Sequence, residues 1–281
     1  MFTDYIFCFK NTLLAIFNCF LYNIIGGDTM KALITGASSG IGRDMARYLA
    51  EQKIDLILAA RNKEELIKLK NELDTNVKIV VIDLSSTDKI KEMFVALRNE
   101  NIDILINNAG FGDIGYFSNT DVSKELNMID VNVKAVHLLT KLFLKEMMKV
   151  NRGYILNVAS TAAFQPGPLM ATYYATKAYV LRLTEAINYE LKKQKSKVVI
   201  SCLCPGPTDT NFNNVANVKF MIKSYTSEYV ARYAIDKMFE KKMIIIPGFR
   251  MRLARFFGRF CSEKRVMRIV FGVQKKKKGK N

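Results

Sequence analysis

The sequence predicts an α/β fold in which helices cover both faces of a doubly wound parallel sheet of about seven strands. Short apolar runs, such as residues 56–58, 79–82 and 243–246, alternate with longer amphipathic segments. The runs are apolar at every position, as expected of strands that are buried on both faces. No linker rich in Pro, Gly or Ser and no internal repeat divides the 281 residues, so we expect a single domain.

The expected strands and helices follow one another in a regular order. Strands are predicted at residues 30–35, 54–60, 77–82, 102–106, 153–159, 197–203 and 243–246, and helices at 40–52, 63–74, 86–99, 121–149, 171–194 and 227–241. Parallel strands joined by helices require right-handed crossovers. Ligands of such sheets bind outside the carboxyl ends of the strands, so motifs that follow strands are the first candidates for a site.

A glycine-rich turn, Thr35 to Gly42, follows the first strand and precedes an amphipathic helix. Its spacing is Gly-x-x-x-Gly-x-Gly, at Gly36, Gly40 and Gly42. Glycines let the backbone turn tightly and let a pyrophosphate approach without a Cβ in the way. The helix N-terminus then offers free N–H groups and a positive dipole end to that anion. This context predicts a dinucleotide site.

Tyr173 and Lys177 are four residues apart in the helix predicted at 171–194, so they project from the same face. An ammonium beside a phenol favours the phenolate, so a lowered pKa is expected for Tyr173. Such a group can exchange a proton with a carbonyl or an alcohol near neutral pH. Taken alone, the pair is equally compatible with a solvated helix face. Ser160 lies thirteen residues before Tyr173.

Six motifs occur in the order found in the short-chain dehydrogenase/reductase family, and the chain resembles that family over about residues 30–249. They are Thr35 to Gly42, Asn107-Asn108-Ala109-Gly110, Asn132 within Asp130-Val131-Asn132-Val133, Ser160, Tyr173-x-x-x-Lys177, and Pro205-Gly206 with Thr208. The resemblance implies a Rossmann fold. It also implies an NAD(P)-dependent enzyme that transfers hydride between nicotinamide and a carbonyl or secondary alcohol.

The resemblance assigns four catalytic residues. Tyr173 would give the substrate oxygen its proton, and Lys177 would hold the ribose hydroxyls and lower the pKa of the tyrosine. Ser160 would hydrogen-bond the carbonyl and stabilise developing charge, and Asn132 would position water for a proton relay. Tyr174 is a rival for the tyrosine, since neighbouring positions on the helix can reach the same cleft.

The resemblance also assigns the cofactor contacts, which are Gly36, Ser38, Ser39, Gly40, Ile41, Gly42, Arg61, Asp83, Asn108, Ala109, Gly110, Tyr173, Lys177, Pro205, Gly206 and Thr208. Ala60 stands where NAD-specific members carry an acid, and Arg61 can pair with a 2′-phosphate. We therefore expect NADP(H) rather than NAD(H). Alternatively Arg61 is a solvated residue and Asp83 a turn residue. Thr208 would anchor the nicotinamide carboxamide.

The substrate is less well specified. Five apolar residues lie near motifs that flank the expected cleft: Phe111, Phe164, Leu169, Met170 and Phe212. They suggest an apolar pocket for a fatty-acyl, aromatic or steroid-like carbonyl compound, and ordinary core packing is an equal alternative. The segment 209–225 has few periodic signals and is expected to cover the substrate as a mobile lid.

The histidine and cysteine content excludes several kinds of site. His137 is the only histidine, which excludes a His-based zinc site and a Ser-His-Asp triad, and no metal is expected. The five cysteines, Cys8, Cys19, Cys202, Cys204 and Cys261, show no disulfide framework. Free thiols are typical of a reducing compartment, so a cytoplasmic protein is expected.

Residues 1–29 precede the first predicted strand and do not fit the domain. The apolar stretch 13–22 is interrupted by Asn18 and is short of the roughly 20 apolar residues of a membrane span. It also lacks the features of a signal peptide. Three interpretations stay open: a start site assigned upstream of Met30 in an AT-rich bacterial genome, a weak membrane anchor, or an ordered cap.

Residues 250–281 form a basic tail with twelve Lys or Arg and one acid, Glu263, so +11 of the net charge of +17 lies there. Leu253, Phe256, Phe257 and Phe260 recur at helical spacing with arginines between them. A basic amphipathic helix of this kind suits an anionic membrane surface. Packing of the apolar stripe on the domain or on a second subunit is the alternative, and no nucleic acid is expected because no recognition motif accompanies the charge.

Two functions from different classes remain at this point. One is an NADP(H)-dependent oxidoreductase, which the complete set of catalytic residues favours. The other is a non-catalytic NADP-binding protein that acts on a membrane or a partner through its basic tail. Relatives commonly pair through the helices that correspond to 121–149 and 171–194, so a homo-oligomer, either a dimer or a tetramer, is expected.

Overall fold

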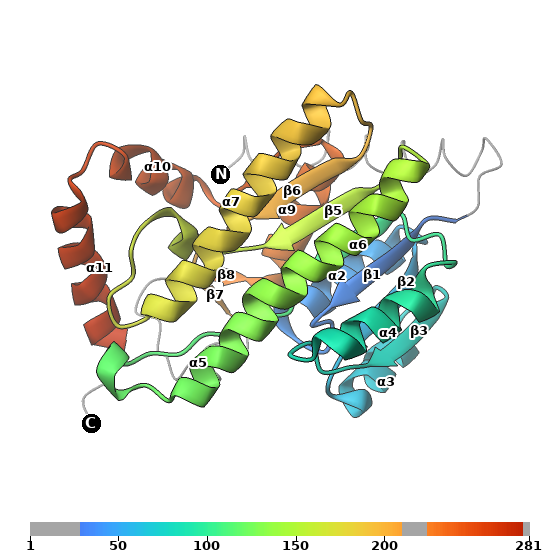
Figure 1. The fold of residues 1–281 in the computed structure, drawn as a ribbon, viewed down its shortest axis with the longest axis horizontal. Coiled ribbons are helices and arrows are strands. Elements are labelled where there is room, and N and C mark those ends of the chain that lie inside the picture. The colour runs from blue at the N-terminus through green and yellow to red at the C-terminus, as the bar shows by residue number, and fades with distance from the viewer. Residues whose placement is uncertain (1–28, 210–223, 278–281) are drawn as a thin grey trace.

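The computed structural model describes residues 29–209 and 224–277. Within them, seven parallel strands form one sheet in the order β3-β2-β1-β4-β5-β6-β9 (Figure 1). The strands are β1 Lys31–Thr35, β2 Asp55–Ala60, β3 Val77–Val81, β4 Ile104–Asn107, β5 Tyr154–Val158, β6 Val199–Leu203 and β9 Ile244–Ile245. The order reverses between β1 and β4. The predicted doubly wound sheet in one domain is therefore confirmed.

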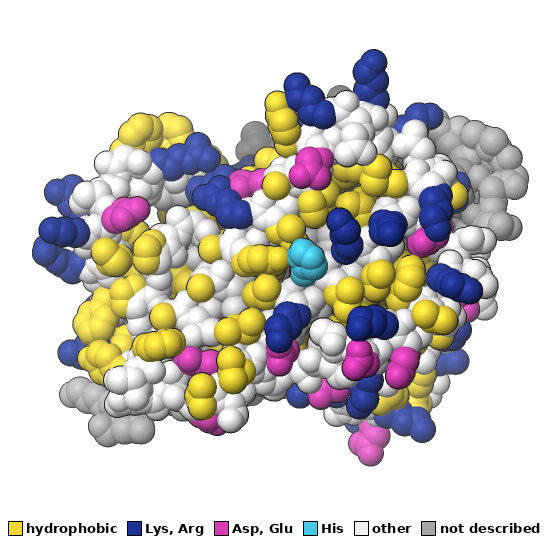
Figure 2. Space-filling model, viewed as in Figure 1, with side chains coloured by type: hydrophobic (Ala, Val, Ile, Leu, Met, Phe, Trp, Pro, Cys, Tyr) yellow, Lys and Arg dark blue, Asp and Glu magenta, His cyan; other side chains and the backbone are white. Residues whose placement is uncertain are grey.

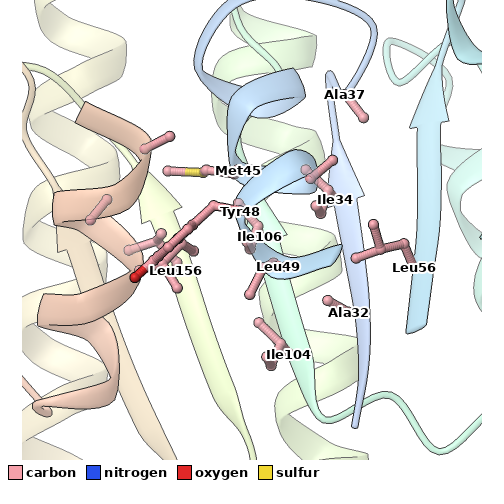
Figure 3. Packing of buried hydrophobic residues seen from close by; sticks show 14 of the residues in the cluster. Ala32, Ile34, Ala37, Met45, Tyr48, Leu49, Leu56, Ile104, Ile106 and Leu156 are labelled. Atoms are coloured by element: carbon pink, nitrogen blue, oxygen red, sulfur yellow. The ribbon is translucent and has the colours of Figure 1, made fainter. Parts of the chain in front are cut away.

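Helices cover both faces of the sheet. One face packs against α2 Gly40–Glu51, α3 Lys63–Glu72 and α9 Ser227–Phe239, and the other against α4 Thr87–Leu97, α6 Val136–Lys149 and α7 Ala171–Lys193. In β1 the alternate residues Ala32 and Ile34 join the core under α2 (Figure 3). Leu33, between them, joins the core under α4 and α6. All three are fully buried. Burial on both sides is why these strands read as continuous apolar runs.

The helix predicted at 121–149 is interrupted. It consists of α5 Val122–Ile129, a π-helical segment Asp130–Ala135, and α6. The prediction of one continuous α-helix was wrong there. A π-helical turn, with i→i+5 hydrogen bonds, adds one residue to the helix, and the residue types at these positions do not distinguish it from an α-helix. The insertion places the Asn132 side chain inside the protein, where the residue is fully buried.

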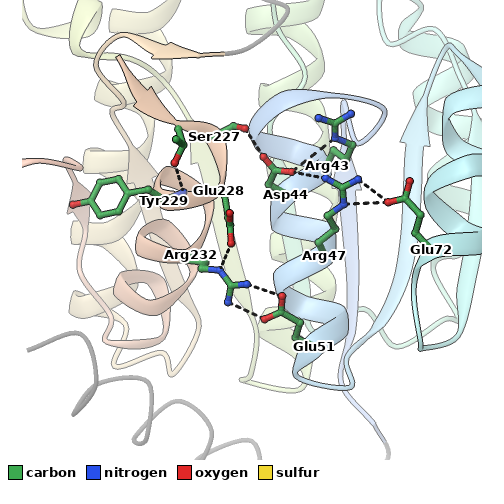
Figure 4. A network of polar contacts seen from close by, with 10 residues as sticks. Arg43, Asp44, Arg47, Glu51, Glu72, Ser227, Glu228, Tyr229 and Arg232 are labelled. Carbon is green, nitrogen blue, oxygen red and sulfur yellow. Dashed lines mark hydrogen bonds and ion pairs between the residues drawn. The ribbon is translucent and has the colours of Figure 1, made fainter. Parts of the chain in front are cut away.

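A polar network joins α2 to α9 on the surface (Figure 4). Ser227 at the start of α9 donates a hydrogen bond to Asp44, and Asp44 also pairs with Arg47 at 3.1 Å. Further along the same helices, Arg232 makes two hydrogen bonds to Glu51, at 2.6 and 2.8 Å. Two-pronged contacts between arginine and carboxylate fix geometry better than single surface pairs do. The network therefore helps to hold α2, whose first residues leave the glycine turn.

The basic tail forms two helices, α10 Phe249–Gly258 and α11 Glu263–Lys277 (Figure 1). The predicted apolar stripe of α10 faces solvent: Leu253, Phe256, Phe257 and Phe260 are 42–76% exposed. Hydrophobic and basic side chains lie together over this part of the surface, at the left of Figure 2. None of the helices in residues 29–209 and 224–277 combines the length and the apolar character that crossing a bilayer requires.

Candidate active site

A cleft of about 750 Å³ opens at the carboxyl ends of the strands. Of the residues predicted for the site, all but Gly42 and Asn132 line it: Gly36, Ser38, Ser39, Gly40, Ile41, Arg61, Asp83, Asn108, Ala109, Gly110, Ser160, Tyr173, Lys177, Pro205, Gly206 and Thr208. They come from loops after six different strands and from α2 and α7. A cleft at the reversal of strand order is where doubly wound sheets bind their ligands.

The glycine turn is packed tightly against the loop after β4. Gly36 has φ +65°, and a Cβ there would lie 2.8 Å from the Cα of Ala109. A Cβ on Gly42 would lie 2.3 Å from Nδ2 of Asn108, which donates hydrogen bonds to the carbonyl oxygens of Thr35 and Gly36. Gly42 thus leaves room for the Asn108 side chain to pack against the turn, and the two hydrogen bonds of Asn108 fix the conformation of the turn.

The first turn of α2 is open to an anion. Ser39 is the N-cap residue, and its side chain makes no hydrogen bond to the amides of the first turn. Those N–H groups point along the helix axis toward the cleft, together with the positive end of the helix dipole. The turn, its glycines and this helix end fit the pyrophosphate of a dinucleotide.

Two arginines line the cleft on this side, Arg61 after β2 and Arg43 in α2. Sequence reasoning missed Arg43. Its position directly after Gly42 was the only feature of the sequence that could have indicated a place in the cleft. Its Nε is buried and has no hydrogen-bond partner in the part of the chain that the structure describes. Asp83 accepts hydrogen bonds from the backbone and hydroxyl of Ser85, and the backbone bond is the main reason why the pKa of Asp83 is lowered.

The side chains of Lys177 and Tyr173 lie beside each other in a buried part of the cleft. The Lys177 ammonium lies 5.9 Å from the centre of the Tyr173 ring and donates a hydrogen bond of 2.9 Å to the carbonyl of Val158. Burial lowers the pKa of Lys177 to about 8. Burial also raises the pKa of Tyr173, and its hydrogen bond with Ser160 opposes that shift only in part. The expected lowering of the tyrosine pKa is therefore wrong for this arrangement, because burial disfavours the charged phenolate.

Ser160 is positioned by the end of β5. It has an extended backbone and is the N-cap of the short 3-10 helix Thr161–Phe164. Its Oγ accepts a hydrogen bond of 3.1 Å from the amide of Ala162, and this contact orients the hydroxyl. The cap therefore presents Ser160 to the cleft next to Tyr173.

Asn132 lies behind the cleft and not in its wall. Its Oδ1 accepts from the Phe111 amide at 3.1 Å, and its Nδ2 donates to the Phe111 carbonyl at 2.8 Å and to Thr176 at 3.2 Å. A Cβ on Gly110 would lie 2.9 Å from Oδ1 of Asn132 and 3.2 Å from Nζ of Lys177. Asn132 thus fixes the loop after β4 where it passes over the lysine.

Comparisons with known proteins identify the family of this chain. A family model described as short chain dehydrogenase matches residues 30–219. The chain belongs to this family. An uncharacterized oxidoreductase of Staphylococcus epidermidis is 34% identical over 181 residues, which are 64% of this chain and 78% of that protein.

Solved structures resemble the whole domain. A short-chain dehydrogenase from Sphingobium yanoikuyae in complex with NADPH is 28% identical with a TM-score of 0.75, over 85% of this chain and 95% of that one. The bulky-bulky ketone specific alcohol dehydrogenase from Comamonas testosteroni is 26% identical with a TM-score of 0.71, over 82% and 92%. As a short-chain dehydrogenase, the protein is an NAD(P)-dependent oxidoreductase.

The rival tyrosine of this short-chain dehydrogenase is already engaged. Tyr174 lines the cleft beside Tyr173, with ring centres 6.1 Å apart in an edge-to-face arrangement. Its hydroxyl accepts a hydrogen bond of 2.6 Å from Nε2 of Gln274 in α11. Only Tyr173 is bonded to Ser160. Sequence reasoning missed Gln274, because nothing in the sequence of a basic tail marks a polar residue that turns toward the cleft.

The apolar residues expected around the substrate are divided. Phe111 and Met170 line the cleft. Phe164 does not, and instead lies under the Arg255 guanidinium at 4.3 Å from the ring centre, while Leu169 is buried beside the cleft. Phe212 and most of the expected lid, residues 210–223, lie outside the described residues.

Proposed function

We propose that the protein is an NADP(H)-dependent reductase of apolar carbonyl compounds, or a dehydrogenase of the corresponding secondary alcohols. The observation that carries the proposal is the convergence of Ser160, Tyr173 and Lys177 on a cleft that also contains the glycine turn. When bound, the nicotinamide would supply hydride to the carbonyl carbon or accept it from the alcohol.

The residues of the chain would move the proton. A buried phenol with a raised pKa is neutral, so Tyr173 can give its proton to the substrate oxygen as hydride reaches the carbon. Ser160, held by its cap bond, would donate a hydrogen bond to that oxygen and stabilise its growing charge. Lys177 would hold the ribose hydroxyls and favour the phenolate that forms. Asn132 would position water that returns the proton.

The substitution Tyr173→Phe tests the assignment, with Tyr174→Phe as the matched control. We expect NADPH oxidation with ketones, aldehydes and 3-oxoacyl thioesters to be lost in Y173F, whereas Y174F retains turnover. NADPH binding, followed by nucleotide fluorescence, should persist in both. Normal turnover in Y173F together with inactivity of Y174F would show that the wrong tyrosine was chosen. The comparisons give no support to a non-catalytic NADP-binding module, which would turn over none of these compounds.

A preference for NADP(H) is supported by charge at the adenosine side of the cleft. Ala60 leaves no carboxylate at the end of β2, and Arg61 and Arg43 both line the cleft nearby. A charge-assisted bond to a 2′-phosphate contributes roughly tenfold or more in affinity. We expect Arg61→Ala and Arg43→Ala to raise KM for NADPH by that factor and to leave KM for NADH unchanged. A wild-type preference for NADH would contradict the proposal.

A second feature favours association with an anionic membrane surface from the cytoplasmic side. The stripe Leu253, Phe256, Phe257 and Phe260 is exposed, and exposed arginines, Arg252 and Arg259, lie next to it. Such a helix binds lipid by its apolar face and its charge together. We expect Phe256→Ser with Phe257→Ser to reduce sedimentation with phosphatidylserine vesicles, while Ile67→Ser, on the exposed side of α3, does not. Equal sedimentation of both variants would end this idea.

A homo-oligomer, dimer or tetramer, is proposed to form through α5, α6 and α7. Apolar side chains are exposed there, among them Val122, Leu126 and Tyr179, which are 65%, 57% and 39% exposed. His137 from α6 contacts the Tyr179 hydroxyl at 2.7 Å in the same face. Light scattering of the wild type and of Leu126→Glu tests the surface, and a monomeric wild type would contradict it.

A further inference from the structure

The C-terminal helix α11 is part of the wall of the cleft. Val270 packs against the buried cluster that contains Tyr173 and Tyr174, and the Phe271 ring lies 6.5 Å from that of Tyr116. Gln274 follows four residues after Val270, so the two share a face of the helix. The basic residues of α11 lie on the solvent side of the helix instead: Lys264, Arg265, Arg268, Lys275 and Lys276 are all exposed. The helix therefore turns its uncharged face to the cleft.

Gln274 is the polar residue on that face. It is 2% exposed and is among the residues that line the cleft. Its Nε2 is used by Tyr174, but its Oε1 is buried and has no hydrogen-bond partner among the described residues. Leaving a buried acceptor unpaired is costly, and native proteins avoid it unless a ligand or water completes the bond.

The partner of Gln274 is held firmly. The Tyr174 ring is packed so closely over Gly167 that a Cβ there would lie 2.1 Å from its Cγ. Met170 and Tyr173 pack in the same cluster. The amide of Gln274 is thus held in place by its hydrogen bond to a closely packed phenol, and its free oxygen has a fixed position at the cleft wall.

We propose that Gln274 is a specificity-determining residue: its Oε1 accepts a hydrogen bond from a hydroxyl or N–H group of the substrate, a few bonds away from the reacting carbonyl. The substrate class is therefore a carbonyl compound with an apolar body and a second, donor group. The inference rests on the carbonyl reduction proposed above. Tyr173, Tyr174 and Gln274 all line the same cleft, so one small molecule bound there can contact both Tyr173 and Gln274.

The proposal predicts discrimination between matched ketones. Acetophenone and its ortho-, meta- and para-hydroxy isomers share one apolar body and differ in the donor. We expect the wild type to favour at least one hydroxy isomer by roughly 5- to 150-fold in kcat/KM, the range for pairing a buried acceptor. In Gln274→Met, which keeps the length of the side chain and removes the acceptor, that preference should disappear and activity on acetophenone should persist.

Controls separate this inference from the proposed function. Arg268→Gln changes an exposed residue of the same helix, and it should behave as wild type. NADPH affinity and the melting temperature show whether Q274M remains folded and loaded. A wild type that reduces none of the ketones contradicts the proposed function. Three other results would overturn the role of Gln274 and leave the proposed function intact. The wild type reduces the ketones without preference for a hydroxy isomer, the Q274M variant keeps the preference, or the Q274M variant loses activity on all the ketones equally.

Discussion

Asn132 provides the sharpest test of how the cleft is built, through the substitution Asn132→Leu. Leucine has a similar volume, but it cannot bond the Phe111 amide and carbonyl or Thr176, which Asn132 holds at 3.1, 2.8 and 3.2 Å. An unpaired buried polar group costs about 1–3 kcal/mol. Because Phe111 is only partly buried, water can reach its backbone, and we take about 2–4 kcal/mol for the two backbone groups together.

This loss should be visible without unfolding the protein, since native domains have about 5–15 kcal/mol of stability. At about 2–4 °C for each kcal/mol, the melting temperature should fall by roughly 4–16 °C. Turnover at 20–30 °C, about room temperature, should fall by roughly 100-fold, because the loop with Gly110 and Phe111 lines the cleft and a misplacement of about 1 Å has that effect.

Asn188→Leu is the matched control. Asn188 lies in α7 and is not among the residues of the cleft, and its side chain makes one hydrogen bond within the described part of the chain, 3.2 Å to the Ile200 carbonyl. Its loss should lower the melting temperature by only about 2–4 °C and leave turnover unchanged. If N132L melts like the wild type, or if it loses no more stability than N188L, Asn132 does not hold the loop and the reasoning is refuted.

Three further predictions concern charge and backbone space. Since the pKa of Lys177 is lowered from 10.5 to about 8, kcat/KM for ketone reduction should fall as pH rises through about 8. The free energy of unfolding should instead rise between pH 8 and 10.5, where the unfolded chain holds the extra proton, and Lys177→Met should remove that rise in urea titrations. Gly42→Ala should weaken NADPH binding more than tenfold by fluorescence titration, because its Cβ would meet the backbone oxygen of Gly36 at 2.5 Å. The pKa of Glu100 is lowered to about 2, mainly by its hydrogen bond from Lys31. The stabilisation that the Glu100 carboxylate gives to the folded protein should therefore be present above pH 4.5 and be lost as pH falls toward 2. Glu100→Gln should reduce this acid dependence of stability in thermal melts by about 1 kcal/mol or less, since the ion pair is partly exposed.

The sheet could be predicted from the sequence because burial on both faces leaves an unbroken apolar run in each strand. The observed strands lie within one or two residues of the expected ones, as with β2 Asp55–Ala60 against 54–60. The position of most site residues along the cleft was also predictable, since their motifs follow the carboxyl ends of strands or lie on the helices that come after them. The π-helical segment Asp130–Ala135 was not, because its residues suit an ordinary helix equally well.

The protonation of the tyrosine could not be predicted from spacing. A four-residue step shows that Tyr173 and Lys177 share a face, and it says nothing about how much water reaches them. Tyr173 is 8% exposed and Lys177 4%. At that depth each charged form is disfavoured, so the pKa of the phenol rises and that of the ammonium falls. Burial depends on how the chain after β5 and after β6 packs around the pair, which the spacing within one helix does not show.

The tail shows the converse problem: its periodicity predicts the helix α10, but it leaves open whether the apolar stripe packs on the domain or faces outward. An apolar stripe on a helix normally faces the core, yet α10 meets the domain through Met251 and Arg255 and leaves its phenylalanines in water. Met251 and the stem of Arg255 are long enough to fill gaps over Phe164 and Gly206, where a Cβ would already lie 2.9 Å from the methionine. Because Gly206 also lines the cleft, α10 touches the site from outside. A molecule that binds the exposed phenylalanines would therefore bind a helix that contacts Gly206 in the wall of the cleft.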